Sequence, residues 1–254
     1  ETERVTISAG VPTVWLALLN FVKDNNLKFS TLKTLVIGGS AAPPAMIRAF
    51  RDEFGVNVLH AWGMTEMSPL GTTCSLKAKH AGVSQEEKFT VQARQGRAPF
   101  GVDMRIVDTA GDELPWDGKA FGDLHVRGPW ITSAYFKNEG GDPLKGGWFP
   151  TGDVANIDAD GYMQITDRSK DVIKSGGEWI SSIDLENIAV AHQAVAEAAA
   201  IGIVHPKWDE RPILVVVKKA GAEVSREELL KFYEGKIAKW WMPEDVVFVN
   251  ELPH

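Results

Sequence analysis

The sequence predicts an α/β protein in which alternating strands and helices lead into a β-rich stretch and then into a small α+β domain. Two short β-prone runs, residues 32–37 and 56–61, each lead into a glycine turn, and a helical pattern follows the first. From about residue 92 to 166 the pattern changes to short β-like runs separated by Gly, Pro and Asp. Beyond it, helical and strand patterns alternate again. We therefore expect two domains, at 1–167 and 168–254, with the β-rich subdomain inside the first.

The N-terminal elements follow from hydrophobic periodicity and from helix-end signals. Between residues 11 and 27, apolar side chains recur at helical spacing, which predicts an amphipathic helix. The strand at 32–37 and the glycine turn at 38–44 precede a second helix, which Gly55 ends because glycine is common just after a helix. If the strands are parallel, both glycine turns lie at the carboxyl ends of strands, where open α/β folds bind ligands.

The later elements are expected in two groups. β-like runs at 103–107, 123–127, 154–157 and 162–165 suggest a distorted barrel. The C-terminal domain is expected to hold helices at 182–192 and 226–239 and strands at 198–204, 213–219 and 246–249. The boundary falls near residues 167–170, and the C-terminal part has about the smallest size of an independent domain.

Composition excludes several classes of protein. The chain has 254 residues, 27 basic and 34 acidic side chains, and a net charge of −7, which argues against a nucleic-acid binder. Cys74 is the single cysteine, so there is neither an internal disulfide nor a cysteine-based metal site, and a reducing, cytoplasmic setting fits best. Because no apolar run reaches the roughly 18–20 residues of a membrane span, we expect peripheral membrane contact at most.

The segment His60-Ala61-Trp62-Gly63-Met64-Thr65-Glu66 is the sharpest local signal for chemistry. It offers an aromatic stacking face, a close approach of the backbone, a hydroxyl donor for phosphate and a carboxylate that suits Mg²⁺. The alternative is a buried Trp beside a turn whose Thr caps a helix.

Three further segments carry candidate groups, each with a structural alternative. Residues 38–44 form a strand-to-helix turn that matches neither a Walker loop nor a dinucleotide fingerprint. Asp153 follows a Thr-Gly turn and could accept both hydroxyls of a ribose, although such an Asp is more often structural. Residues 167–180 combine alternating charges with a Ser-Gly-Gly turn, as in a hinge with a mobile loop, or in a solvated linker before a hairpin.

The order of these motifs resembles the adenylate-forming superfamily of acyl-CoA synthetases, peptide-synthetase adenylation domains and beetle luciferases. They run Gly-Gly-Ser-Ala-Ala-Pro, Trp-Gly-Met-Thr-Glu, Thr-Gly-Asp and then Asp-Arg-Ser-Lys-Asp-Val-Ile-Lys-Ser-Gly-Gly-Glu. With Trp179 after the last Glu, the sequence looks most like medium- and long-chain fatty acid-CoA ligases. The resemblance implies the C-terminal half of the large domain, followed by a small mobile C-terminal domain.

The resemblance also implies a reaction and a set of site residues. Such enzymes use ATP and Mg²⁺ to form an acyl-adenylate and pyrophosphate, and then rotate the small domain so that CoA attacks. The nucleotide site would consist of Gly39, Ser40 and Ala41 at the adenine, Trp62 against the base, Gly63 beside the acyl carbonyl, Thr65 on the α-phosphate, Glu66 on Mg²⁺, and Asp153 and Arg168 at the ribose. The thioester step would use Lys170 as the hinge and Gly176 and Gly177 at the pantetheine tunnel, with Lys174 nearby.

Two parts of the family pattern have no match in this sequence. The phosphate loop that precedes these motifs is not found before Ile37, and the lysine segment that completes adenylation would follow His254. We therefore expect a fragment with little activity alone. The alternatives are a ligase for aryl or other acids, a carrier-protein thiol as acceptor, or a non-catalytic nucleotide- or acyl-binding module. Oligomeric state, pathway and acyl chain length cannot be inferred from the sequence.

Overall fold

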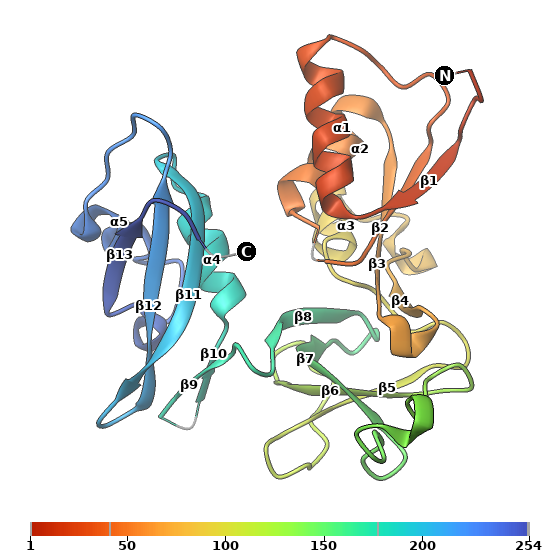
Figure 1. Ribbon diagram of the computed structural model, residues 1–254. Helices are drawn as coiled ribbons and strands as arrows, with labels where there is room; N and C mark the ends of the chain where they lie inside the picture. Colours follow the sequence, from red (N-terminus) through yellow and green to blue (C-terminus); the bar gives the residue numbers. More distant parts are fainter. Residues whose placement is uncertain (1, 41, 177, 253–254) are drawn as a thin grey trace. The chain divides into compact units, whose positions relative to one another are not determined.

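The computed structural model describes residues 2–40, 42–176 and 178–252 and divides into two compact units (Figure 1). The N-terminal unit comprises Glu1–Thr151 and Ala155–Ile165, and the C-terminal unit comprises Gly152–Val154 and Thr166–His254. The domain boundary expected between residues 167 and 168 stays a prediction.

The first sheet of the N-terminal unit has the strand order β1-β2-β3-β4. Its strands are β1 (Ile7–Gly10), β2 (Thr34–Ile37), β3 (Asn57–Gly63) and β4 (Leu70–Thr73). The pairs β1–β2 and β2–β3 are parallel, whereas β3–β4 is antiparallel. The helices of the N-terminal unit are α1 (Pro12–Asp24), α2 (Pro44–Phe54) and α3 (Gln85–Gln92). The parallel pairing of β2 and β3 confirms that both glycine turns follow the carboxyl ends of neighbouring strands.

The helix-end signals explain why α2 was predicted correctly. Pro44 stands at the first helical position, and Gly55 ends the helix in the left-handed region with φ of 66°. Phe50 on α2 and Leu35 and Ile37 on β2 are completely buried in the same core. The sequence did not predict β1, β4 or α3.

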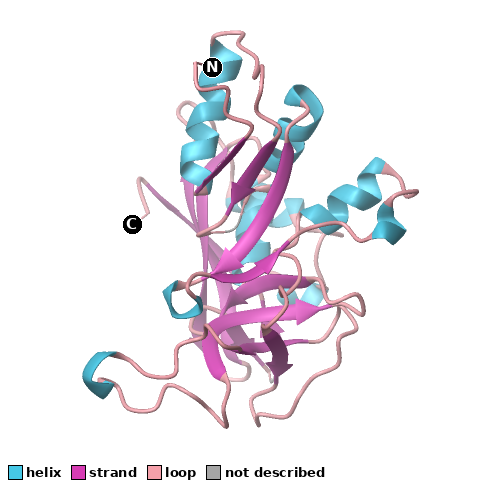
Figure 2. Ribbon diagram, turned by 90° about the vertical axis from the view of Figure 1, so that its right-hand side faces the viewer, coloured by secondary structure: helices cyan, strands magenta, loops and turns pink. Residues whose placement is uncertain are grey.

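The β-rich region forms a second sheet, in the order β5-β6-β7-β8. Its strands are β5 (Asp103–Val107), β6 (Phe121–Arg127), β7 (Phe149–Ile157) and β8 (Met163–Arg168), all magenta in Figure 2. The β-rich prediction is confirmed as this sheet. The described residues place β5 and β8 at opposite ends of the order, which is an open arrangement and not a closed barrel.

The C-terminal unit is an α+β domain built on one mixed sheet in the order β10-β9-β12-β11, with β13 parallel to β12. Its elements are β9 (Ile173–Ser175), β10 (Glu178–Ile180), α4 (Ser182–Val190), β11 (Val195–His205), β12 (Asp209–Lys218), α5 (Arg226–Phe232) and β13 (Asp245–Val249). The prediction that the helix after Arg226 continues to Lys239 was wrong. Gly235 adopts φ of 76°, outside the helical region, and the chain turns there.

The remaining composition-based expectations have simple structural counterparts. Among the described residues, no helix is long and apolar enough to cross a membrane. Cys74 is buried, and burial raises the pKa of its thiol to about 12, so it is a packing residue and not a nucleophile.

Candidate functional site

The glycine turn after β2 lies beside the end of β3, as the parallel register requires. Ile37 pairs with His60 in that register. Gly39 has φ of 87°, and a Cβ added there would lie 3.0 Å from Cγ1 of Val11. Gly39 and Ser40 are exposed at this strand end, whereas Ala41 lies outside the described residues. The adenine contacts assigned to these positions stay predictions.

Trp62 is placed differently from the free stacking face that the motif suggested. Its side chain is only 8% exposed and belongs to the core of the N-terminal unit. A Cβ added at Gly71 on β4 would lie 2.4 Å from the indole, so the ring packs directly on that glycine. Trp62 therefore has the packing role of the alternative interpretation, and its contact with a base stays a prediction.

Thr65 and Glu66 lie on a short 3-10 helix (Thr65–Met67) directly after β3. Met67 is completely buried and anchors this turn, while Thr65 is exposed and Glu66 is half-buried. The Tyr135 hydroxyl donates to Oε1 of Glu66 at 3.0 Å. Desolvation, followed by the bond to Glu66, raises the pKa of Tyr135, so the phenol stays a donor. The sequence had no signal for this partner.

The donor set at this turn suits magnesium. Among the described residues, no group of three or more His, Cys, Asp or Glu side chains could hold a metal ion on its own. Mg²⁺ usually takes one or two protein carboxylates and completes its coordination with water and substrate phosphate. Glu66 meets that requirement.

The C-terminal unit brings three of the predicted residues together around Gly152. Arg168 Nη1 lies 2.7 Å from Oδ1 of Asp153, whose side chain is 4% exposed while that of Arg168 is 56% exposed. The Ser169 amide donates to the Gly152 carbonyl at 3.0 Å. A pocket of about 440 Å³ is lined by Gly152, Arg168, Ser169 and Lys170. The Arg168 guanidinium, which is paired with Asp153, and the exposed Lys170 line the same pocket.

Asp167 is a buried carboxylate that the sequence placed in the hinge motif without a role. It is 1% exposed and accepts hydrogen bonds from the amides of Arg168 (2.7 Å) and Ser182 (2.5 Å) and from the Ser182 hydroxyl (3.0 Å). Burial raises its pKa, and these hydrogen bonds oppose the shift. Asp167 therefore joins the end of β8 to the start of α4.

Glu186 on α4 gives a pH-dependent prediction in the same region. It lines a pocket of about 660 Å³ with Asp167, Asp171 and Glu210, and accepts the Ala200 amide at 3.0 Å. Burial, followed by the charges of Asp167 and Asp171, raises its pKa above the usual value of 4.5. A raised native pKa means that the ionised form opposes folding, so this penalty is present above the native pKa and absent below 4.5.

We expect Glu186→Gln to raise the melting temperature at pH 8 and to leave it nearly unchanged at pH 4, since Gln can still accept the Ala200 amide. Thermal melts of the whole chain at both pH values provide the test. Glu227→Gln, on the exposed start of α5, serves as the control. A larger gain at pH 4 than at pH 8 would contradict the sign.

The predicted glycine loop is the tip of the hairpin formed by β9 and β10. Gly176 has φ of 62°, and its amide donates to the Trp208 carbonyl at 2.8 Å. A Cβ added there would lie 2.9 Å from Cε3 of the Trp208 ring. Lys174 is exposed, and its amide donates to Glu210 at 2.9 Å. Gly177 lies outside the described residues.

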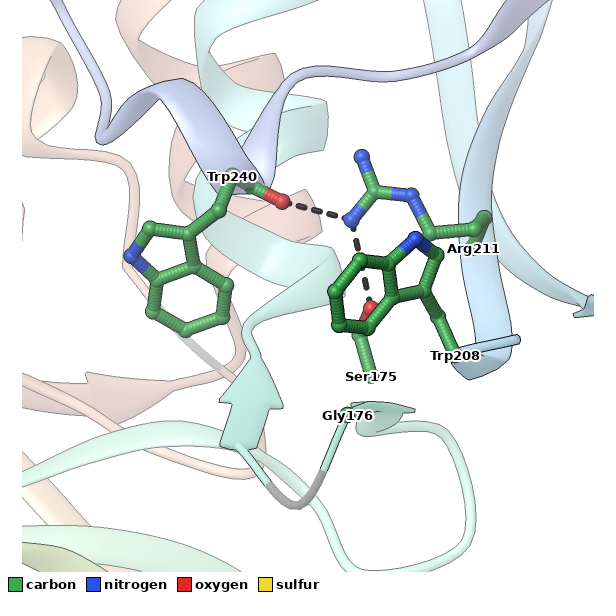
Figure 3. Close-up of a pocket in the computed structure, with 5 residues that line it drawn as sticks. All are labelled: Ser175, Gly176, Trp208, Arg211 and Trp240. Carbon is green, nitrogen blue, oxygen red and sulfur yellow. Dashed lines mark hydrogen bonds between the residues drawn. The ribbon is translucent and has the colours of Figure 1, made fainter.

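Gly176 also lines a pocket of about 380 Å³ that the sequence did not predict (Figure 3). The other lining residues are Ser175, Trp208, Arg211 and Trp240. Arg211 donates to the carbonyl oxygens of Trp240 (2.6 Å) and Met242 (3.0 Å) and to the Ser175 hydroxyl (3.2 Å). It also pairs with Glu244 at 2.9 Å. With the guanidinium held by these partners, the two indoles provide the apolar walls.

Comparison with known proteins agrees with this arrangement. The AMP-binding enzyme family model matches residues 1–136, and the model of the AMP-binding enzyme C-terminal domain matches residues 184–254. The chain is 55% identical to 3-methylmercaptopropionyl-CoA ligase of Ruegeria lacuscaerulensis, covering 100% of this chain and 47% of that protein. It is 48% identical to the medium-chain-fatty-acid–CoA ligase of Ectopseudomonas oleovorans, covering 99% and 46% respectively.

The structure is similar to that of o-succinylbenzoate CoA synthetase from Bacillus subtilis in complex with ATP and a magnesium ion. The TM-score is 0.80 at 27% identity, over 98% of this chain and 49% of the other. The chain spans about half the length of the curated relatives it matches. With both family models matched in order along it, the chain belongs to the AMP-binding enzyme family.

Proposed function

We propose that the protein to which this chain belongs is an ATP-dependent acid–CoA ligase that works through an acyl-adenylate. The observation that carries the proposal is the turn after β3, where the exposed Thr65 hydroxyl stands next to a Glu66 carboxylate held by Tyr135. A protein that only binds a nucleotide does not need a carboxylate that binds magnesium next to a hydroxyl that donates to a phosphate. The relatives named above, both acid–CoA ligases, support this reading.

The first half-reaction follows from the chemistry of these groups. The carboxylate oxygen of the acid attacks the α-phosphorus of ATP, the bond to the bridging oxygen breaks, and pyrophosphate leaves. Negative charge builds on the phosphoryl oxygens, so catalysis depends on fixed donors and cations. Thr65 donates to the α-phosphate, and Glu66 would hold a Mg²⁺, which would supply positive charge against the phosphate oxygens. Asp153, oriented by Arg168, accepts the ribose hydroxyls.

The second half-reaction uses the C-terminal unit. The CoA thiolate attacks the acyl carbonyl carbon, and AMP leaves with the bonding electrons. Lys170 serves as the hinge about which the part of the small domain that follows it turns between the two steps, and its exposure leaves it free to reorient. The loop at Gly176, with Lys174 nearby, guides the pantetheine arm, and the apolar pocket of Figure 3 lies next to that loop.

The acid is proposed to be a medium- or long-chain fatty acid, and the medium-chain-fatty-acid–CoA ligase of Ectopseudomonas supports the medium-chain part of this proposal. A short thioether acid is the second candidate, favoured by the 55% identity to 3-methylmercaptopropionyl-CoA ligase. Acid, ATP and CoA would be the partners, without nucleic acid, and a cytoplasmic location is part of the same proposal.

A mass-spectrometric product assay tests the proposal. The chain, and a version extended to the length of its relatives, are each given ATP, Mg²⁺, CoA and one acid from a graded series that includes 3-methylmercaptopropionate. We expect acyl-adenylate and acyl-CoA from the extended version, and the best acid identifies the substrate class. If acyl-adenylate forms without acyl-CoA, the acceptor is not CoA but another group, such as a carrier-protein thiol. No adenylate from any acid would favour the binding module.

A further inference from the structure

His125 lies in the middle of β6, and only 6% of its surface is exposed. The register pairs it directly with Arg105 on β5, and two residues further along β6 it pairs Arg127 with Asp103. These four side chains therefore lie on one face of the sheet. Nε of Arg127 lies 2.9 Å from Oδ2 of Asp103. Neither the motifs nor the proposed mechanism uses His125.

The hydrogen bond between Arg105 and His125 can exist in only one protonation state of the imidazole. Nη2 of Arg105 lies 3.5 Å from Nδ1 of His125. Because a guanidinium has donors and no acceptor, Nδ1 is the unprotonated nitrogen, and the neutral ring carries its proton on Nε2. A second proton would occupy Nδ1 and remove the acceptor. It would also place two positive charges directly opposite each other across the strand pair, which is destabilising.

The surroundings of His125 disfavour that second proton. Burial is the largest cause that lowers the pKa of His125, and the charge of Arg105 lowers it further. Asp123 on β6 raises the pKa, and Lys145, just before β7, lowers it again, while Arg127 is held in its ion pair. With a folded-state pKa below the ordinary 6.5, the unfolded chain binds the proton first as the pH falls. The folded state therefore keeps its full stability above 6.5 and loses part of it below that value.

Trp148 connects this strand pair to the turn that leads into β7. Cζ of Arg105 lies 4.6 Å from the centroid of the Trp148 ring, and Cζ of Arg127 lies 4.3 Å from it. The Lys145 amide donates to the Trp148 carbonyl at 2.7 Å, and the Trp148 amide donates to the Lys145 carbonyl at 3.1 Å. Arg105 is thus in contact both with His125 and with the residue that closes this turn.

We propose that His125 is an acid-sensitive contact: the neutral ring holds Arg105 against Trp148, and the protonated ring releases it. The turn between Lys145 and Trp148 then loosens. β7 itself stays in the sheet, because the Thr151 hydroxyl still donates to a carbonyl of β6 at 2.9 Å. The change is confined to one turn of the N-terminal unit, and the inference does not depend on the proposed function.

Hydrogen exchange of the Trp148 amide in the 254-residue chain tests the inference. Protection is expressed relative to an unstructured peptide at the same pH, which removes the intrinsic pH dependence of exchange. We expect the protection to fall about tenfold between pH 7.5 and pH 5, the upper effect of losing one hydrogen bond. In His125→Asn the amide oxygen takes the place of Nδ1 and cannot be protonated, so the protection should change less than about threefold. His80→Asn is the matched control, since His80 is also buried and accepts the Lys77 amide at 3.1 Å, and it should keep the wild-type loss.

Nitrogen chemical shifts of His125 give a second readout that does not depend on how the His125 variant folds. At pH 7.5 they should show the proton on Nε2, and the ring should titrate below pH 6.5. Arg105→Gln should move that titration to higher pH, because it removes a positive charge. A proton on Nδ1 at pH 7.5 would overturn the inference. So would wild-type protection that is the same at both pH values, or an equal loss of protection in His125→Asn and the wild type.

Discussion

Glu66→Gln is expected to slow pyrophosphate release by the extended chain roughly 10²–10³-fold, the scale seen when one group that stabilises transition-state charge is removed. Gln has nearly the same size and can still accept the Tyr135 hydroxyl, which lies 3.0 Å from the native carboxylate. What it lacks is the negative charge that a hard cation such as Mg²⁺ requires. The turn should therefore keep its shape while the reaction loses charge neutralisation.

Pyrophosphate release is measured at several Mg²⁺ concentrations, and ATP binding is measured separately by calorimetry. We expect the variant to need more Mg²⁺ and to lose far less in ATP affinity than in rate. Glu86→Gln is the control, since Glu86 forms an exposed ion pair with Arg48 at 2.8 Å and such pairs contribute little. A variant with wild-type rate and wild-type Mg²⁺ dependence would remove Glu66 from the proposed mechanism.

Gly63→Ala is expected to lower the free energy of unfolding by about 3 kcal/mol or more, at or above the upper range of overpacking substitutions. A Cβ at this position would lie 1.8 Å from the Pro69 carbonyl oxygen and 3.1 Å from the Gly71 amide nitrogen. Both obstacles are backbone atoms, so no change of side-chain rotamer can relieve the overlap. The β3–β4 connection must open, and the Thr65–Met67 turn within it must shift.

Urea unfolding of the 254-residue chain provides the measurement. Gly82→Ala is the matched control, because a Cβ there meets nothing within 4 Å and the position has no left-handed backbone. It should change the free energy of unfolding by less than about 0.5 kcal/mol, as is usual for surface positions. Equal stability of Gly63→Ala and the control would contradict the close approach of Pro69.

The elements predicted correctly are those with strong local signals. The proline at the start of α2 and Gly55 at its end define that helix without tertiary information. β1 was missed because Ile7–Gly10 is short and partly exposed, with little hydrophobic pattern. α3 had a readable signal, the Ser84 and Glu87 capping box, but little apolar periodicity.

The site residues that were predicted correctly are likewise those with a local sequence signal. Motif order placed Thr65 and Glu66 in the turn where the structure has them, whereas Asp153, expected after a turn, lies within β7 and Arg168 ends β8. The roles of these residues stay predictions. The packing of Trp62 on Gly71 and the contact of Gly176 with Trp208 depend on pairings between separate strands or loops. Such pairs leave no periodic trace in one sequence, which is why Tyr135, Asp167 and the pocket of Figure 3 were not predicted.

The hairpin that carries Gly176 is tied down at both ends. At its base, Asp167 links the end of β8 to Ser182, and at its tip the Gly176 amide bonds to Trp208. The conformational entropy of Gly176 is thus lost when the chain folds and not when a ligand arrives. Gly176 and Trp208 both follow Lys170 in the chain, so in the proposed turn about that residue they move together, whereas the bonds between Asp167 and Ser182 span it. In the proposed ligase, a thiol substrate would therefore meet Gly176 already in place, without the cost of ordering that residue.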